Sequence, residues 1–266
     1  MLPTGQQAEI WTSIPFWLGL IYVTFPLNFM VYAWNDIVDQ EIDKDNIRKD
    51  SFWFGAKGTK EELKGLWKLI LASQLLFFPL FFYYMQVEAI YIFLAFFVIN
   101  TLYNLPKNGL RSLPPLELLC QIGYLLIAPL CIYLNDLAQL PWQTYVYLFL
   151  FAIQSQLIGE VMDIEPDRKS GRRTTATVLG MRWTKVLIIF VVLVEVLLLF
   201  FVYDEIIFGI MLGFGLLWLL IDLFIIYKTQ VYTLRQMKLF AIMSNLVALV
   251  SMAYVWWSGC LLEVSI

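Results

Sequence analysis

Histidine is absent from the 266 residues of this sequence, and cysteine occurs only three times. Without histidine, the chain has no imidazole for a zinc or iron site, a Ser-His-Asp triad or a general base. Cys120, Cys131 and Cys260 are too scattered for a disulfide framework or for metal-ligand spacing. A metal ion bound here must therefore be held by oxygen ligands, which favours a hard cation such as magnesium.

Charged residues are also scarce, at 15% of the chain, whereas hydrophobic residues make up 61%. Soluble domains are usually nearer half apolar, so the surplus indicates that the lipid bilayer is a partner of this chain. The net charge is −3, and the sequence has no basic arm and no basic patch interleaved with aromatic residues. These features exclude nucleic acid as a partner, and no protein partner is predicted.

Apolar runs long enough to cross a bilayer occur eight times along the chain. Because a spanning backbone must satisfy its own hydrogen bonds, such runs predict helices. The predicted fold class is therefore all-α, a polytopic transmembrane bundle of about eight helices in one domain over 1–266. The expected spans are 14–34, 66–85, 88–105, 116–134, 141–160, 184–203, 206–227 and 238–258.

Lysine and arginine are confined to four stretches, and the four intervening loops contain none of the 18 basic residues. The basic stretches are 44–68, 107–111, 168–185 and 228–238. Loops that alternate in this way follow the positive-inside rule. We therefore expect a multi-pass protein of the cell membrane whose basic loops are cytoplasmic and whose two termini face the opposite side.

Three aspartates follow the first apolar run, at Asp36, Asp39 and Asp43. If the helix continues past the run, their spacing places them on one face, and Asn28 and Asn35 extend that face into the membrane. Stacked carboxylates repel one another, and no lysine is interleaved among them. The natural counter-charge is a divalent cation, so the row predicts a metal site at the cytoplasmic boundary.

A second acidic row lies where the fifth apolar run leaves the membrane. Gln156, Glu160, Asp163 and Asp167 recur at helical spacing, and the basic cluster 168–173 follows them. Such a cluster would attract phosphate oxygens. Either row alone could be a solvated helix boundary, but two rows on one predicted membrane face favour two metal ions bridging a diphosphate.

Three ordered motifs make the sequence similar to the UbiA superfamily of intramembrane prenyltransferases. They are Asn-Asp-x-x-Asp-x-x-x-Asp from Asn35, Tyr-Asn-Leu-Pro-Lys from Tyr103 with Arg111, and Asp-x-x-x-Asp-Arg-x-x-Gly-x-x-Thr-Thr-Ala from Asp163. Within the superfamily, the stretches 20–28 and 166–180 are most similar to the carotenoid branch, which includes lycopene elongases.

The resemblance implies a bundle around a central chamber in which an allylic isoprenyl diphosphate is ionised. Its prenyl group passes to a lipophilic acceptor, such as a carotenoid or a quinone precursor. Two magnesium ions would be held by the catalytic carboxylates, in two rows that face each other across one cavity mouth: Asp36, Asp39, Asp43, Asp163 and Asp167. The implied substrate contacts are Asn28, Asn35, Arg48, Lys49, Tyr103, Lys107, Arg111, Gln156, Arg168 and Arg172.

Two other functions are compatible with the acidic rows. A UbiA-type terpene cyclase would ionise the same diphosphate without an acceptor, at an identical metal site. A divalent-cation carrier would place carboxylates near the bilayer midplane, whereas these rows lie at its boundary among basic residues. The family pattern usually has nine helices and this chain begins just before the second, so we expect either an upstream start or an eight-helix version.

Overall fold

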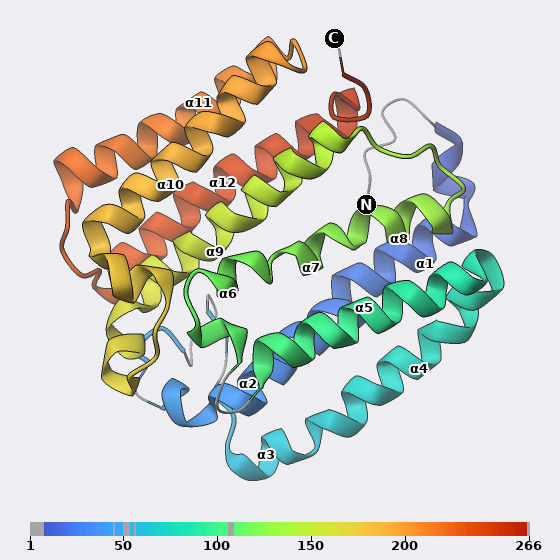
Figure 1. The fold of residues 1–266 in the computed structure, drawn as a ribbon, viewed down its shortest axis with the longest axis horizontal. Helices are drawn as coiled ribbons and strands as arrows, with labels where there is room; N and C mark the ends of the chain where they lie inside the picture. Colours follow the sequence, from blue (N-terminus) through green and yellow to red (C-terminus); the bar gives the residue numbers. More distant parts are fainter. Residues whose placement is uncertain (1–7, 45, 50–53, 56, 106–108, 265–266) are drawn as a thin grey trace. The chain divides into compact units, whose positions relative to one another are not determined.

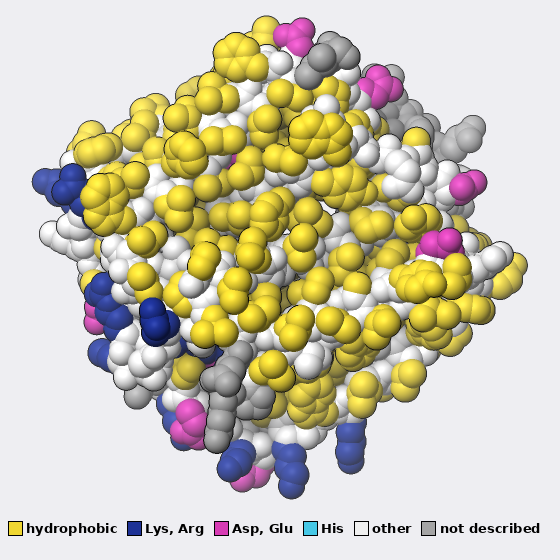
Figure 2. Space-filling view, in the orientation of Figure 1, with side chains coloured by type: hydrophobic (Ala, Val, Ile, Leu, Met, Phe, Trp, Pro, Cys, Tyr) yellow, Lys and Arg dark blue, Asp and Glu magenta, His cyan; other side chains and the backbone are white. Residues whose placement is uncertain are grey.

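The computed structural model describes residues 8–44, 46–49, 54–55, 57–105 and 109–264. These residues confirm the predicted all-α fold class. Across the described ranges, eight helical segments are long and apolar enough to cross a membrane. Hydrophobic side chains cover most of the face drawn in Figure 2, and Tyr83, Phe201 and Trp257 are strongly exposed. Such a surface is expected where lipid is the solvent.

Two compact units make up the chain (Figure 1). Unit 1 comprises the described residues within 8–113 and 122–139, and unit 2 comprises residues 114–121 and 140–264. Unit 1 contains η1 (Ala8–Thr12), α1 (Ile14–Tyr22), η2 (Val23–Leu27), α2 (Asn28–Asp43), α3 (Lys60–Lys64), α4 (Leu66–Met85), α5 (Val87–Asn104), η3 (Leu110–Ser112), α7 (Ile122–Leu125) and α8 (Ile127–Leu134). Unit 2 contains α6 (Leu116–Leu119), α9 (Trp142–Ser170), α10 (Thr175–Phe201), α11 (Ile206–Ile221), η4 (Asp222–Ile226) and α12 (Leu234–Ser258). The predicted central chamber and the single domain over 1–266 stay predictions.

Several helices extend beyond the predicted spans, while 66–85 coincides with α4. The first span runs on to Asp43 and the fifth runs on to Ser170. The sixth begins at Thr175 rather than 184, with a kink at Gly180, where the backbone leaves helical geometry. Hydropathy detects only the part of a helix that lies in hydrocarbon, whereas backbone hydrogen bonding continues into water. The fourth span, 116–134, is broken into α6, α7 and α8, and Pro129 has no N–H to continue the ladder after α7.

The first membrane span of unit 1 contains a widened turn at Pro26. This turn, η2, is a π-helix between α1 and α2, and proline removes a backbone donor there. Gln74 of α4 donates to the Pro26 carbonyl at 2.9 Å and accepts from the Tyr22 hydroxyl at 2.7 Å. Both side chains are buried. The bridge therefore fixes the direction in which α2 continues toward its acidic end.

In unit 2, α9 packs on α10, α10 on α11, and α11 on α12 (Figure 1). A buried ion pair joins the turn after α11 to α10, because Lys185 Nζ lies 2.6 Å from Asp222 Oδ2. The Tyr232 hydroxyl donates to the same oxygen at 2.7 Å, and Lys185 also donates to the Lys228 carbonyl at 2.8 Å. Charges this deeply buried must be paired, so the network holds the turn in place.

Candidate functional site

The first acidic row lies on the final turns of α2, in unit 1. Because α2 continues to Asp43, the spacing of Asp36, Asp39 and Asp43 does place them on one helix face. Asp39 is only 4% exposed, whereas Asp36 and Asp43 are half-buried. Three carboxylates on one helix face, one of them buried, need nearby positive charge.

Lys49 supplies positive charge to two of these carboxylates. Its Nζ lies 2.7 Å from Asp36 Oδ1 and 3.3 Å from Asp43 Oδ2. Burial lowers the pKa of the Lys49 ammonium, but its hydrogen bonds and charge interactions with Asp36 and Asp43 outweigh burial and leave that pKa above its ordinary value. The two carboxylates therefore converge on one cationic group.

Arg111 pairs with the third carboxylate. It lies in η3, is 6% exposed, and its Nη1 forms an ion pair with Asp39 Oδ1. The two residues are 72 positions apart in the sequence, so the contact is a product of the fold. Lys49 and Arg111, both predicted as substrate contacts, thus lie at the predicted metal ligands.

The other residues predicted for the site in unit 1 lie on α2, on α5 and in the segment that follows α2, except for one outside the described residues. Asn35 Nδ2 donates to Asn104 Oδ1 at 3.4 Å, and Asn28 is half-buried at the start of α2. The Arg48 guanidinium lies over the Phe54 ring, 5.4 Å from its centroid. Tyr103 is half-buried near the end of α5, and Lys107 lies outside the described residues.

The second acidic row lies on the last turns of α9, in unit 2. The helix continues through Pro166 to Ser170, so the row is helical throughout. Asp167 is 4% exposed and lies 3.6 Å from Arg172, measured between Oδ1 and Nη1. Asp163 is half-buried, and Arg168 Nη1 lies 3.6 Å from Glu165 Oε1.

Two buried glutamates hold the start of α10 beside this row. Glu117 of α6 is fully buried and accepts the Thr175 N–H at 2.6 Å, while Glu160 of α9 accepts the Ala176 N–H at 3.0 Å. Carboxylates at a helix N-terminus satisfy unpaired N–H groups and complement the helix dipole. Gln156 reinforces the arrangement, since its Nε2 donates to Glu160 Oε1 at 3.1 Å.

Glu117 and Glu160 were not among the residues predicted for the site. The spacing of the second acidic row includes Glu160, but the sequence does not predict its hydrogen bond with the Ala176 N–H at the start of α10. Glu117 gave a weaker signal, as one ionisable residue in an apolar run. A helix start at Thr174 could have been read from its capping box with Thr177, which the structure contains.

Replacing Glu160 with alanine is expected to lower the free energy of unfolding by about 1–3 kcal/mol, because the Ala176 N–H loses its buried acceptor. Thermal unfolding of the purified protein in detergent measures the loss. Glu165→Ala is the matched control on the same helix, and this more exposed residue should change stability by about 0.5 kcal/mol or less. Equal losses in the two variants would contradict the role given to Glu160.

The chemistry of the α2 row fits a hard divalent cation. Its donors are carboxylate oxygens, and the Lys49 ammonium shows that positive charge can sit between Asp36 and Asp43. Within the part of the chain that the structure describes, no three Asp, Glu or Cys side chains are grouped closely enough to hold a metal ion. A metal ion here would compete with Lys49 and Arg111 for the carboxylates.

Comparison with known families and proteins gives a consistent result. The sequence model of the UbiA prenyltransferase family matches residues 4–246. The lycopene elongase/hydratase of Corynebacterium glutamicum is 25% identical over 171 residues, which cover 63% of this chain and 59% of that protein. The enzyme of the same name from Haloarcula japonica is 29% identical over 160 residues, covering 60% of this chain and 53% of that protein. The chain thus spans little more than half the length of these relatives.

Solved structures with a similar fold include a UbiA homologue from Archaeoglobus fulgidus. The form bound to DMAPP and Mg²⁺ gives a TM-score of 0.62 at 20% identity, covering 95% of this chain and 89% of that chain. The form bound to GPP and Mg²⁺ gives 0.61 at 19% identity, covering 96% and 90%. These likenesses show the fold, and the resemblance inferred from the three motifs is confirmed.

Proposed function

This chain belongs to the UbiA prenyltransferase family, and from that premise we propose that it is an intramembrane prenyltransferase that depends on a divalent cation. It ionises an allylic isoprenyl diphosphate and transfers the prenyl group to a lipophilic acceptor. The observation that carries the proposal is the α2 row, whose three carboxylates each contact a lysine or arginine. A complex of a metal ion with a diphosphate has positive charge for the carboxylates and negative charge for the lysine and arginine. It can therefore replace each ion pair of such a row with a new one.

Magnesium is the proposed metal, and two ions are proposed. The ligands would be Asp36, Asp39, Asp43, Asp163 and Asp167. When bound, Mg²⁺ neutralises the diphosphate and stabilises it as a leaving group. The bound forms of the Archaeoglobus homologue, with DMAPP or GPP and Mg²⁺, support both the metal and an allylic donor.

The basic side chains would neutralise the negative charge of the diphosphate that the metal ions do not offset. Lys49 and Arg111 lie at the α2 row, and Arg172 lies at the second row. We propose that they bind oxygen atoms of the diphosphate, together with Arg48, Lys107 and Arg168. Asn28, Asn35, Tyr103 and Gln156 are proposed as further substrate contacts.

The proposed reaction breaks the carbon–oxygen bond of the donor, and the diphosphate leaves with the electron pair. The π electrons of the acceptor form a bond to the allylic carbon, and the resulting cation loses a proton. Aromatic rings can stabilise the cation, and an apolar surrounding keeps water from capturing it. The names of the curated relatives support a carotenoid of the lycopene type as acceptor.

The protein is proposed to reside in the cell membrane with both acidic rows on the cytoplasmic side. Eight apolar helical segments within the described residues make it a multi-pass membrane protein. The orientation is supported by the 18 basic residues, which fall in only four stretches. Both acidic rows are next to such stretches.

The purified chain in lipid nanodiscs, given DMAPP or GPP with Mg²⁺, tests the function. We expect diphosphate release together with a prenylated product when lycopene is present. A cyclic hydrocarbon or alcohol from the donor alone would instead assign terpene cyclisation. Failure to release diphosphate from any allylic donor, across a panel of carotenoid and quinone-precursor acceptors, would overturn both.

Removal of divalent cations is expected to lower the rate of prenyl transfer by roughly 10³-fold. Without the ions, only the basic side chains stabilise the negative charge of the leaving diphosphate. The rate is measured after dialysis against EDTA and again after magnesium is restored. Thermal unfolding before and after chelation is the control, and it should show that the metal-free protein is still folded at the assay temperature. Full activity in the metal-free protein would contradict the proposed metal dependence.

A further inference from the structure

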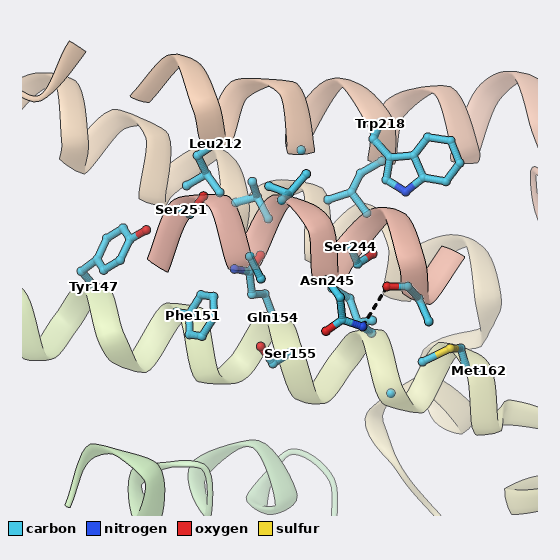
Figure 3. A pocket seen from close by; sticks show the side chains of 18 residues that line it. Tyr147, Phe151, Gln154, Ser155, Met162, Leu212, Trp218, Ser244, Asn245 and Ser251 are labelled. Carbon is cyan, nitrogen blue, oxygen red and sulfur yellow. Dashed lines mark hydrogen bonds between the residues drawn. The ribbon is translucent and has the colours of Figure 1, made fainter. Parts of the chain in front are cut away.

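Unit 2 contains a cavity of about 260 Å³ between α9, α10, α11 and α12 (Figure 3). One buried water molecule needs only about 10–15 Å³, so the cavity has room for a ligand. Its wall is mostly apolar, with Phe151, Leu212 and Val247 among the residues that line it. Ser155 and Asn245 also line the cavity and are exposed, so it opens to the surface of the unit.

The cavity lies on a different face of α9 from the second acidic row. Phe151, Ser155 and Met162 line it, whereas the row is formed by Gln156 and the acidic residues that follow. With 3.6 residues per turn, the two sets point about 150° apart around the helix axis. Gln156 hydrogen-bonds to Gln121, at 3.1 Å, on the side of α9 that faces away from the cavity. The cavity is thus separate from the proposed catalytic carboxylates.

Three polar atoms on the cavity wall are buried and have no hydrogen-bond partner among the described residues. They are Trp218 Nε1 on α11 and the hydroxyl oxygens of Ser244 and Ser251 on α12. Ser251 is only 6% exposed. Hydrocarbon offers no water to such groups, so each one lowers the stability of the unit unless a ligand pairs with it.

These polar atoms are placed at two ends of the cavity. Figure 3 shows Trp218 and Ser244 on one side of the drawn pocket, and Ser251 with Tyr147 on the other. The two serines are seven residues apart on one helix, which is about 10 Å along its axis. Between them the wall carries apolar side chains together with the polar side chains of Gln154, Ser155 and Asn245. Two of the three unpartnered atoms lie at the Trp218 end, so the arrangement suits an elongated molecule whose polar group pairs with Trp218 and Ser244 there.

We propose that this cavity binds a long-chain aliphatic alcohol, with its hydroxyl between Trp218 and Ser244 and its chain along the apolar wall. Trp218 Nε1 can only donate, whereas a serine hydroxyl can donate or accept, so a ligand hydroxyl satisfies both. As the structure describes them, the lining residues include no Lys, Arg, Asp or Glu. A charged head group would therefore be left unpaired in this cavity.

Photolabelling of the full chain in phosphatidylcholine nanodiscs tests the proposal, with a long-chain alcohol that carries a diazirine as the probe. We expect labelled peptides from α9, α11 and α12, and competition by the unlabelled alcohol. An alkane probe of the same length should label these peptides about tenfold less. Equal labelling by the alkane, or no labelling of these peptides by the alcohol, would overturn the proposal.

Gly159→Leu is the variant that fills the cavity. A Cβ built at Gly159 meets nothing within 4 Å, and this residue lines the cavity, so a leucine there should extend into it. We expect labelling to fall about tenfold. Gly213→Leu is the matched control, because a Cβ at Gly213 is equally free and this residue is not part of the lining. Equal labelling in the two variants would overturn the proposal.

A second variant covers the case in which Gly159→Leu does not fold. Trp218→Phe removes the indole donor and reduces the ring to a single one, and it should lower labelling by the alcohol severalfold, while labelling by the alkane does not fall. Unchanged labelling by the alcohol would overturn the role of Trp218. All of these readouts measure binding rather than turnover, so they remain informative even if prenyl transfer is not the activity.

Discussion

Asp163→Asn is expected to lower the rate of prenyl transfer by roughly 10³-fold, which corresponds to about 4 kcal/mol of transition-state stabilisation. An asparagine keeps the size of the side chain but removes the charge that holds a divalent cation. Asp163 is half-buried on α9, so the substitution should change the unfolding temperature little. The measurement is diphosphate release from DMAPP or GPP with Mg²⁺, together with thermal unfolding.

Glu165→Gln is the matched control for Asp163. It removes the same charge two positions away, from a residue that is half-buried like Asp163 and whose Oε1 lies 3.6 Å from Arg168 Nη1. We expect this variant to retain most of the activity. If Asp163→Asn turned over as fast as Glu165→Gln, the assignment of Asp163 as a metal ligand would be wrong.

Arg111→Leu is expected to lower the free energy of unfolding by about 3–5 kcal/mol. The reason is that Asp39, only 4% exposed, would keep its charge in a buried place without its guanidinium partner. Replacing a whole buried ion pair with apolar residues is often neutral. The double variant Asp39→Leu/Arg111→Leu should therefore recover most of the lost stability, as measured by thermal or denaturant unfolding in detergent.

The same double variant separates folding from catalysis. It should stay inactive although it is stable, because the proposed ligand Asp39 is missing. Activity in the stable double variant would remove Asp39 from the metal site. A double variant as unstable as Arg111→Leu alone would show that the two side chains do not act as a pair.

The existence of the membrane helices was predictable because it depends on a local property. An apolar run such as 66–85 must form a helix in lipid, and α4 has these bounds. Helix ends were less predictable, since the α10 start at Thr175 depends on a cap and on two glutamates from other helices. The break in 116–134 likewise depends on local backbone chemistry that hydropathy does not report.

The acidic rows were predictable from spacing, but their counter-charges were not. Helical periodicity alone places Asp36, Asp39 and Asp43 on one face. The pairing of Asp39 with Arg111 spans 72 positions and exists only in the folded chain. The cavity of unit 2 could not be predicted from the sequence either. Residues of four helices form it, and in the sequence these helices are ordinary apolar spans.

On the proposed function, the Lys49 ammonium between Asp36 and Asp43 would make metal binding at the α2 row an ion exchange rather than a simple addition. Lys49 and Arg111 already offset two of the three carboxylate charges, so the ion would have to replace an internal cation, which would moderate its affinity. The freed ammonium would then be available to the incoming phosphate oxygens, and it could return to the carboxylates when the product diphosphate leaves. On the proposed function, the local electrostatic balance would stay nearly constant through each turnover.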